Sequence, residues 1–287
     1  MPGPSCLTRH LDPHALVGPR LACRWSPDLY IVATTSGSIR LIGVPATPTL
    51  VQKLGAVFSL APEELAALSA LPSRLVRLAG DTEIHRAGDC PTSCFVVVDG
   101  LVSSSKMIED GKRQIMSFYV PGDMPDIRTL HLGLIDCDVH AVGPCQLAVM
   151  EHADLRALCE AHPRVASAFW RCTLVMGSIY REWIVNIGHR SALARVAHLL
   201  CEMMVRLETA GRARGKICDL PLTQVHLSQA AGLSTVQVNR SLQELRRREL
   251  ITFSGGRLTV PDWDGLTRLA YFRPDYLYLS DPCLRTA

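Results

Sequence analysis

A short run of polar side chains, followed by arginines, has the residue types and spacing that read the edges of nucleic-acid bases. The residues are Ser234, Thr235, Gln237, Asn239, Arg240 and Gln243. A guanidinium can donate two hydrogen bonds to guanine O6 and N7, and an amide can pair with adenine. Hydroxyls at a helix start suit a phosphate, because free backbone N–H groups point there as well. We therefore expect Arg240 to read a base, and Ser234 and Thr235 to contact the DNA backbone.

Two predicted helices joined by a tight turn must position these side chains. The first begins after Thr223, a good N-cap that we add to the expected DNA contacts, and Gly232 supplies the left-handed turn at no steric cost. The second begins at Ser234 and has an apolar stripe of Val238, Leu242 and Leu245. This pattern is typical of a helix-turn-helix, whose second helix enters the major groove. An ordinary helical hairpin with a solvated face is the alternative.

A predicted β-hairpin follows the second helix directly. Residues 251–260 alternate apolar side chains around Gly255 and Gly256, and Arg257 at the tip can reach a flanking phosphate. A hairpin in this place is the wing of a winged helix. Residues from about 190 to 260 resemble the winged-helix DNA-binding domain of the Crp/Fnr family of bacterial transcription regulators. The string from Gly232 to Arg240 is similar to that family's helix-turn-helix signature.

The resemblance implies a sequence-specific, DNA-binding regulator of transcription. Arg240 matches the arginine that the family keeps in this helix. Well-known members also have a glutamate that accepts a hydrogen bond from cytosine N4, and the two places where it would align hold Thr235 and Val236. We therefore do not expect this chain to bind the half-site sequence of those relatives. We expect a palindromic operator with half-sites about one helical turn, ~34 Å, apart.

Positive charge is concentrated in the same part of the chain. Residues 190–273 hold 13 Lys and Arg against 7 Asp and Glu, a balance of +6, although the whole chain has a net charge of only +3. Phosphate binding requires such a balance, and a winged helix that binds a protein partner does not. Arg246, Arg247 and Arg248 lie a turn or more beyond Arg240, so we expect them to contact the backbone or neighbouring side chains.

Turn glycines divide the first half of the chain. Gly88, Gly100, Gly111 and Gly122 separate β-rich runs at intervals of 12, 11 and 11 residues. Short strands at such spacing predict a β-sandwich or barrel. Residues 72–150 resemble the cyclic-nucleotide-binding β-roll of the family. The predicted fold class is α+β: an N-terminal β-roll of jelly-roll type, a long dimerisation helix and a C-terminal winged helix-turn-helix.

The helix predicted from Pro163 to about residue 187 has a heptad seam. Its members are Val165, Phe169, Cys172, Met176, Ile179, Trp183 and Asn186. Spacings of four and three are typical of a coiled coil. A second stripe, comprising Ala168, Leu174, Val175 and Ile184, is left over for the β-roll. We therefore expect the first stripe to form a homodimer, as the family does through this helix; packing on its own roll is the alternative.

Five segments are predicted along the chain. They are a poorly patterned extension (1–48) with a plausible strand pair at 30–34 and 38–44, a sensor β-roll (49–162), a dimerisation helix and hinge (163–188), a winged helix (189–272) and a C-terminal tail (273–287). By resemblance, the hinge transmits the signal from the roll to the DNA-binding domain.

The sequence lacks the motifs for the two ligands that the resemblance suggests, a cyclic nucleotide and an iron–sulfur cluster. Nucleotide-binding members anchor the phosphate with Gly-Glu-Leu followed by Arg-Ser-Ala, but Asp126 and Ile127 stand in place of Gly-Glu, and acids at 136 and 138 occupy the region of Arg-Ser. These acids would repel cAMP, and Arg128 is a weak substitute. Four grouped thiolates are needed for an iron–sulfur cluster, but Cys6 and Cys23 stand alone. We predict no cofactor and no metal.

Other cysteines leave two alternatives open. Cys90, Cys94, Cys137 and Cys145 could meet as a thiol switch or metal site, although buried or incidental cysteines explain them more simply. An enzyme with Cys90 or Cys94 as redox nucleophile lacks the base that such a thiol needs. The chain is therefore expected to be no enzyme, and the signal is left open.

Eleven cysteines without a C-x-x-C pair favour a reducing compartment. We find no basic region followed by an apolar core at the N-terminus, and no run of the ~20 apolar residues that a membrane helix needs. We expect a cytoplasmic protein without a membrane partner. Its expected partners are double-stranded DNA, a second copy of the chain and, by resemblance, RNA polymerase.

Overall fold

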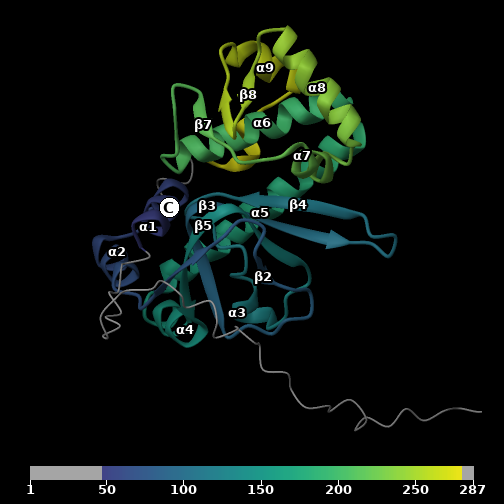
Figure 1. The fold of residues 1–287 in the computed structure, drawn as a ribbon. Helices are drawn as coiled ribbons and strands as arrows, with labels where there is room; N and C mark the ends of the chain where they lie inside the picture. The colour runs from purple at the N-terminus through teal and green to yellow at the C-terminus, as the bar shows by residue number, and fades with distance from the viewer. Residues whose placement is uncertain (1–46, 280–287) are drawn as a thin grey trace, which may run out of the picture. The chain divides into compact units, whose positions relative to one another are not determined.

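The computed structural model describes residues 47–279, so the strand pair expected at 30–34 and 38–44 lies outside the described residues (Figure 1). The first half of this range is a β-roll. Its strands are β1 (Arg74–Leu78), β2 (Glu83–His85), β3 (Ser93–Met107), β4 (Arg113–Tyr119) and β5 (Asp138–Glu151). They form an antiparallel sheet of order β1-β5-β3-β4, and β2 also pairs with β5.

The glycines that the sequence marked as turns have left-handed backbones. Gly88, Gly100, Gly111 and Gly122 all have positive φ angles, between 80° and 100°. At Gly100 the reason is also steric, because a Cβ atom there would lie 2.5 Å from the carbonyl oxygen of Pro144. The close approach of β3 to β5 therefore requires a residue without a side chain.

Helices cover the roll and lead out of it. They are α1 (Thr47–Val57), α2 (Pro62–Ser69), α3 (Thr129–Leu132), α4 (His152–Ala161) and the long α5 (Pro163–His189). Side chains of α1, α2, α4 and α5 form one apolar cluster with Cys94 and Val96, on one face of β3. Phe95 and Val97, on the opposite face of β3, belong to a second apolar cluster inside the roll. The long helix was predicted from Pro163, and this start is confirmed.

The second half of the range is a winged helix. Its elements are α6 (Ala192–Thr209), β6 (Ala213–Arg214), β7 (Ile217–Asp219), α7 (Gln224–Ala231), α8 (Thr235–Arg247), β8 (Thr252–Ser254), β9 (Arg257–Thr259), α9 (Trp263–Ala270) and the 3-10 helix η2 (Pro274–Leu277). Strands pair in the order β6-β7-β9-β8. Within residues 47–279, no helix is both long and apolar enough to cross a bilayer.

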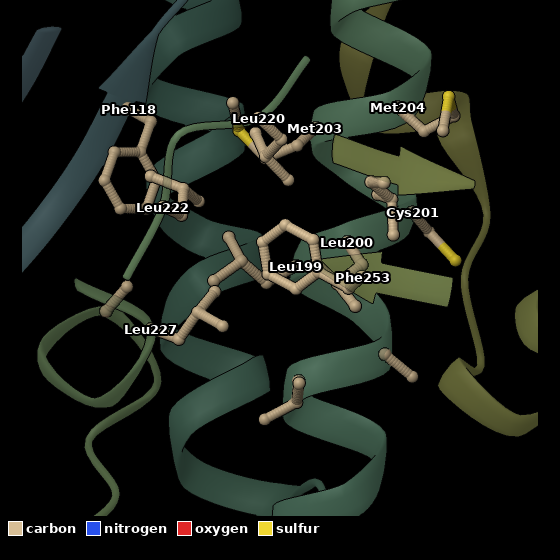
Figure 2. Close-up of a cluster of buried hydrophobic side chains, with 14 of the residues drawn as sticks. Phe118, Leu199, Leu200, Cys201, Met203, Met204, Leu220, Leu222, Leu227 and Phe253 are labelled. Atoms are coloured by element: carbon tan, nitrogen blue, oxygen red, sulfur yellow. The ribbon is translucent and has the colours of Figure 1, made fainter. Parts of the chain in front are cut away.

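One apolar cluster runs from α6 through the helix-turn-helix to strand β4 of the roll. Leu199, Leu200 and Met203 of α6 pack there with Leu227 of α7. Figure 2 shows the ring of Phe118, on β4, beside Leu222, which precedes α7. The amide of Gln114 on β4 also donates to the carbonyl of Ala230 at 3.3 Å. The helix-turn-helix is thus supported by a strand of the roll as well as by α6.

The predicted dimer seam on α5 is wrong in its assignment of faces. Val165, Phe169, Ile179 and Trp183 are 0, 6, 3 and 5% exposed within a single chain, and Cys172 and Met176 are half-buried. In the stripe assigned to the roll, Ala168 is buried as expected and Val175 is half-buried, but Leu174 and Ile184 are 59 and 70% exposed. Heptad spacing identified a buried face correctly, but this face packs against the chain's own roll and α6.

Three buried charged side chains, Asp123, Glu202 and Arg206, form an ion cluster with the half-buried Lys53, and we call these four the buried ion cluster. Arg206 of α6 donates to Asp123, in the turn after β4, at 2.8 Å and to Glu202 at 3.1 Å. Lys53 of α1 lies 2.9 Å from the other Asp123 oxygen. Burial works to raise the pKa of Asp123, but the charges of Lys53 and Arg206 outweigh it and hold that pKa below its usual range.

Further hydrogen bonds tie this cluster to α5 and to the segment after α9. Trp183 Nε1 donates to Glu202 at 3.0 Å, and the Tyr276 hydroxyl donates to the same carboxylate at 2.8 Å. Next to it, His198 of α6 packs against the rings of Phe272 and Tyr276 and is fully buried. Burial, with the positive charge of Arg190, lowers the pKa of His198 to about 3.

The buried His198 predicts a specific loss of stability in mild acid. The unfolded chain binds a proton at this histidine below a pKa of about 6.5, whereas in the folded chain burial and the charge of Arg190 lower the pKa to about 3, against the pull of the Glu182 carboxylate 3.2 Å from Nε2. Above pH 6.5 this group therefore leaves the stability unchanged, and as the pH falls toward 3 it lowers the unfolding free energy by an amount on the order of 5 kcal/mol. We expect His198→Phe to flatten the unfolding free energy between pH 4 and 6.5 in denaturant titrations, and the exposed His131→Gln to leave it unchanged. An unaltered slope in His198→Phe would contradict the buried neutral ring.

Candidate nucleic-acid interface

Both helices of the helix-turn-helix begin and end where local side-chain chemistry predicts. The Thr223 hydroxyl accepts from the His226 N–H at 3.2 Å and caps α7. Gly232 ends α7 in the left-handed conformation, with φ of 61°. Ser234 caps α8 by accepting from the Gln237 N–H at 3.2 Å. The predicted helix-turn-helix is confirmed.

Helix α8 turns its apolar stripe inward and leaves its polar face to solvent. Val238, Leu242 and Leu245 are at most 2% exposed. The first turns of α8 expose five side chains. Gln237 belongs to the cap of the helix, and the other four, Thr235, Val236, Arg240 and Gln243, form the face that is expected to meet DNA and that we call the DNA-reading face. Among the described residues, no hydrogen bond or ion pair engages the Arg240 guanidinium. This arginine is therefore free to bind a guanine edge.

Two of the predicted base-reading amides have partners within the protein. The Gln237 side-chain oxygen accepts from the backbone N–H of Ser234 at 3.0 Å, which completes a capping box. Asn239 donates from its side chain to Gln224 of α7 at 3.2 Å. These contacts orient α8 relative to its own start and to α7. Gln237 and Asn239 therefore have structural tasks that the sequence analysis did not assign to them, although Ser234 and Gln237 have the spacing of a capping box.

The three arginines at the end of α8 are also engaged, as expected for contacts with neighbours. Arg247 and Arg248 both donate to Glu244, at 2.8 and 2.7 Å. Their hydrogen bonds lower the pKa of Glu244 to about 2. Arg246 donates to the Phe253 carbonyl at 2.6 Å and so joins α8 to the wing.

The wing has the predicted glycine turn. Gly255 and Gly256 have φ angles of 57° and 74°, and Arg257 follows them with an exposed side chain. Its guanidinium lies 3.5 Å from Asp219 on β7. An exposed ion pair of this kind is weak, so Arg257 can exchange the carboxylate for a phosphate at little cost.

A buried carboxylate occupies the part of the roll where the resemblance would place a nucleotide phosphate. Asp126 is fully buried, accepts from the Phe95 N–H at 3.0 Å and lies 3.1 Å from His85 Nε2. Nearby, Arg128 donates to the Pro125 carbonyl at 2.6 Å and lies 3.1 Å from Asp136. This arginine is therefore engaged by the protein itself.

The four cysteines of the thiol hypothesis do not gather. Cys94 lies in the cluster on one face of β3, whereas Cys137 and Cys145 lie in the cluster inside the roll, and Cys90 is exposed. Burial raises the pKa of Cys145 to about 11 and that of Cys94 still further, so both remain unreactive thiols. No group of three or more metal-ligating side chains exists between residues 47 and 279.

Known protein families match both halves of the chain. The model of the Crp-like helix-turn-helix domain matches residues 194–269, and that of the cyclic nucleotide-binding domain matches residues 75–162. Together the two ranges cover more than half of the chain. The protein belongs to the Crp/Fnr family. It is a DNA-binding transcription regulator of that type and not an enzyme.

Individual relatives agree with this membership of the Crp/Fnr family. The nitrogen fixation regulation protein FixK of Azorhizobium caulinodans is 26% identical over 209 residues, which are 70% of this chain and 84% of the relative. The transcriptional activator protein FnrL of Cereibacter sphaeroides is 27% identical over 205 residues, which are 69 and 80% of the two chains. The structure of FixK2 from Bradyrhizobium japonicum has the same fold, with a TM-score of 0.64 and 24% identity over 69% of this chain and 98% of that one.

Sequence reasoning assigned Leu174 and Ile184 to a stripe facing the roll, although they belong to an exposed stripe on α5, and it missed the buried ion cluster. The stripe, which we call the outer stripe, consists of Trp170, Leu174, Gly177, Arg181 and Ile184. Its members are also spaced alternately four and three residues apart, but Gly177 and Arg181 make this stripe less apolar than the heptad seam that begins at Val165. The ion cluster left no signal, because Asp123 and Arg206 are 83 positions apart.

The free guanidinium of Arg240 predicts a defined loss of specificity. We expect Arg240→Ala to weaken operator binding by about 1–3 kcal/mol and to remove the preference for guanine at one position of each half-site. Arg247→Ala is the matched control, since Arg247 is held by Glu244 on the same helix. Selection of bound sequences from a random DNA pool measures both effects. Identical base preferences in the wild type and Arg240→Ala would contradict the assignment.

Proposed function

We propose that this protein acts as a cytoplasmic homodimer that binds a palindromic operator and regulates transcription through RNA polymerase. The observation that supports it best is the exposed DNA-reading face of α8, held by two caps and joined to a basic wing. A face of this kind, on the second helix of a helix-turn-helix, fits the major groove. Two copies related by a twofold axis would present two such faces to consecutive turns of DNA.

The outer stripe of α5 supports the homodimer. Trp170, Leu174 and Ile184 are 67, 59 and 70% exposed, and they lie on one face of a 27-residue helix. Three large exposed apolar side chains at heptad spacing are costly in water and are typically covered by a second helix. Gly177, in the middle of the stripe, would allow two such helices to approach closely.

A cavity beside α5 supports sensing of a small molecule by the roll. It measures about 120 Å³ and lies between α1, the turn after β4, and α5, with Leu54, Met124, Phe169, Met176 and Tyr180 among its walls. Such a volume and lining suit a small, largely apolar ligand. Because α5 forms one wall and also bears the outer stripe, occupancy would act on the helix that joins the proposed dimer. Cyclic nucleotide or thiol-redox sensing is less consistent with the buried Asp126 and the protonated Cys94 and Cys145.

Salt dependence tests DNA binding against the alternative of a winged helix that binds a protein. We expect the logarithm of the affinity for operator DNA to fall steeply and linearly with the logarithm of salt concentration, because phosphate contacts release counterions. Gel-shift titrations at salt concentrations between about 50 and 200 mM measure this slope. A flat slope, or no binding to any genomic fragment at low salt, would count against the proposal.

The outer stripe predicts how the dimer can be broken. We expect Leu174→Glu combined with Ile184→Glu to give a folded monomer, because paired helices would bring like charges together in an apolar seam. Ala157→Glu, on the exposed face of α4, adds the same charge away from the stripe and should leave the dimer intact. Analytical ultracentrifugation reports the mass, and circular dichroism verifies folding. A dimer that survives the double substitution would show that α5 is not the seam.

A further inference from the structure

The described chain continues beyond the winged helix. The family model of the helix-turn-helix domain ends at residue 269, and α9 ends at Ala270. Residues 271–279 follow, and we call them the C-terminal strap. Its Tyr271 and Tyr278 both have left-handed backbones, with φ angles of 49° and 52°. This conformation is unfavourable for a tyrosine and persists only where surrounding contacts hold it. The strap is therefore fixed by its contacts with the rest of the protein.

On one side, the strap contacts α5. Leu277 is 1% exposed and lies in the apolar cluster that also contains Ile179 and Trp183 of α5. Arg171, earlier on the same helix, has its guanidinium carbon 5.9 Å from the centre of the Tyr278 ring, whose face attracts a cation. The strap thus packs along the helix through which we propose that two copies join.

On the other side, the strap contacts α6 and the junction between α5 and α6. The Tyr276 hydroxyl donates to Glu202 of α6 at 2.8 Å. Arg190 belongs to the short junction between the two helices, and it donates to the carbonyls of Ala270 and Tyr271, where the strap begins, at 3.2 and 3.4 Å. The strap therefore braces the two helices on either side of their junction.

In a twofold dimer joined along α5, the angle between α5 and the winged helix determines how far apart the two α8 helices lie. Consecutive base pairs of duplex DNA are about 3.4 Å apart, and each is turned by about 34°, so a small change of this angle alters the half-site spacing that fits. We propose that the C-terminal strap holds this angle and thereby sets the half-site spacing that the protein accepts. This inference rests on the proposed homodimer and its palindromic operator. Tyr276 and Leu277 act as positioning residues, through α5 and α6.

Operators whose two half-sites are moved together or apart by one or two base pairs test the strap. We expect each such change to weaken wild-type binding about tenfold, because one base pair rotates a half-site by about 34° around the duplex axis. In Leu277→Ala combined with Tyr276→Phe, the same changes should weaken binding less than about threefold. A fragment with a single half-site is the reference, and both proteins should bind it equally. A general loss of folded protein would lower all affinities together and leave their ratios unchanged.

Two further variants serve as controls. Tyr278→Phe is the matched control, because within residues 47–279 no hydrogen bond involves the Tyr278 hydroxyl, and the ring that Arg171 contacts is kept. Leu277→Met replaces one buried apolar side chain by another of similar volume. Both should retain the wild-type spacing preference. Circular dichroism verifies the folding of each variant.

A milder substitution keeps the test decisive should the double variant fail to fold. Tyr276→Phe alone removes one hydrogen bond to Glu202, and we expect it to reduce the spacing preference about twofold.

An unchanged spacing preference in the folded double variant, or in Tyr276→Phe where the double variant is unfolded, would overturn the role of the strap while leaving DNA binding intact. Equal binding of the wild type to every spacing would do the same. Failure of the wild type to bind any palindromic operator more tightly than a single half-site would instead refute the proposed homodimer.

Discussion

Arg206 is a cation with almost no access to water, and two carboxylates hold its guanidinium in place. Asp123 reaches it from the turn after β4, and Glu202 from the preceding turn of its own helix. Taking such a charge out of water costs several kcal/mol, and the two carboxylates offset that cost only in this geometry. The ion cluster is therefore weak as a source of net stability and strong as a constraint on arrangement.

Other contacts between the roll and the winged helix become possible under this constraint. With α6 fixed against the turn after β4, Leu227 of α7 reaches the cluster that includes Phe118 of β4, and Gln114 reaches the Ala230 carbonyl. Trp183 and Tyr276 then complete the hydrogen bonds to Glu202 from α5 and from the segment after α9. One buried carboxylate thus joins α5, α6 and the segment after α9.

Local chemistry could be predicted from the sequence, and long-range partners could not. Thr223, Gly232 and Ser234 each determine the backbone within a few residues, so both ends of α7 and the start of α8 followed from them alone. The face of α5 was different: its period revealed a buried stripe, but a period does not say whether the covering surface belongs to the same chain or to another. Nor does any sequence pattern link Asp123 to Arg206, because their encounter depends on the whole roll being folded.

The capping box of α8 has a consequence for how regulators of this kind diversify. By engaging Gln237, and by tying Asn239 to Gln224, the protein separates the residues that build the helix from those left to touch DNA. The remaining exposed positions carry almost no folding energy, since none of them enters a core. After gene duplication, one or two substitutions there would suffice to give a daughter protein its own set of promoters, without passing through an unstable ancestor.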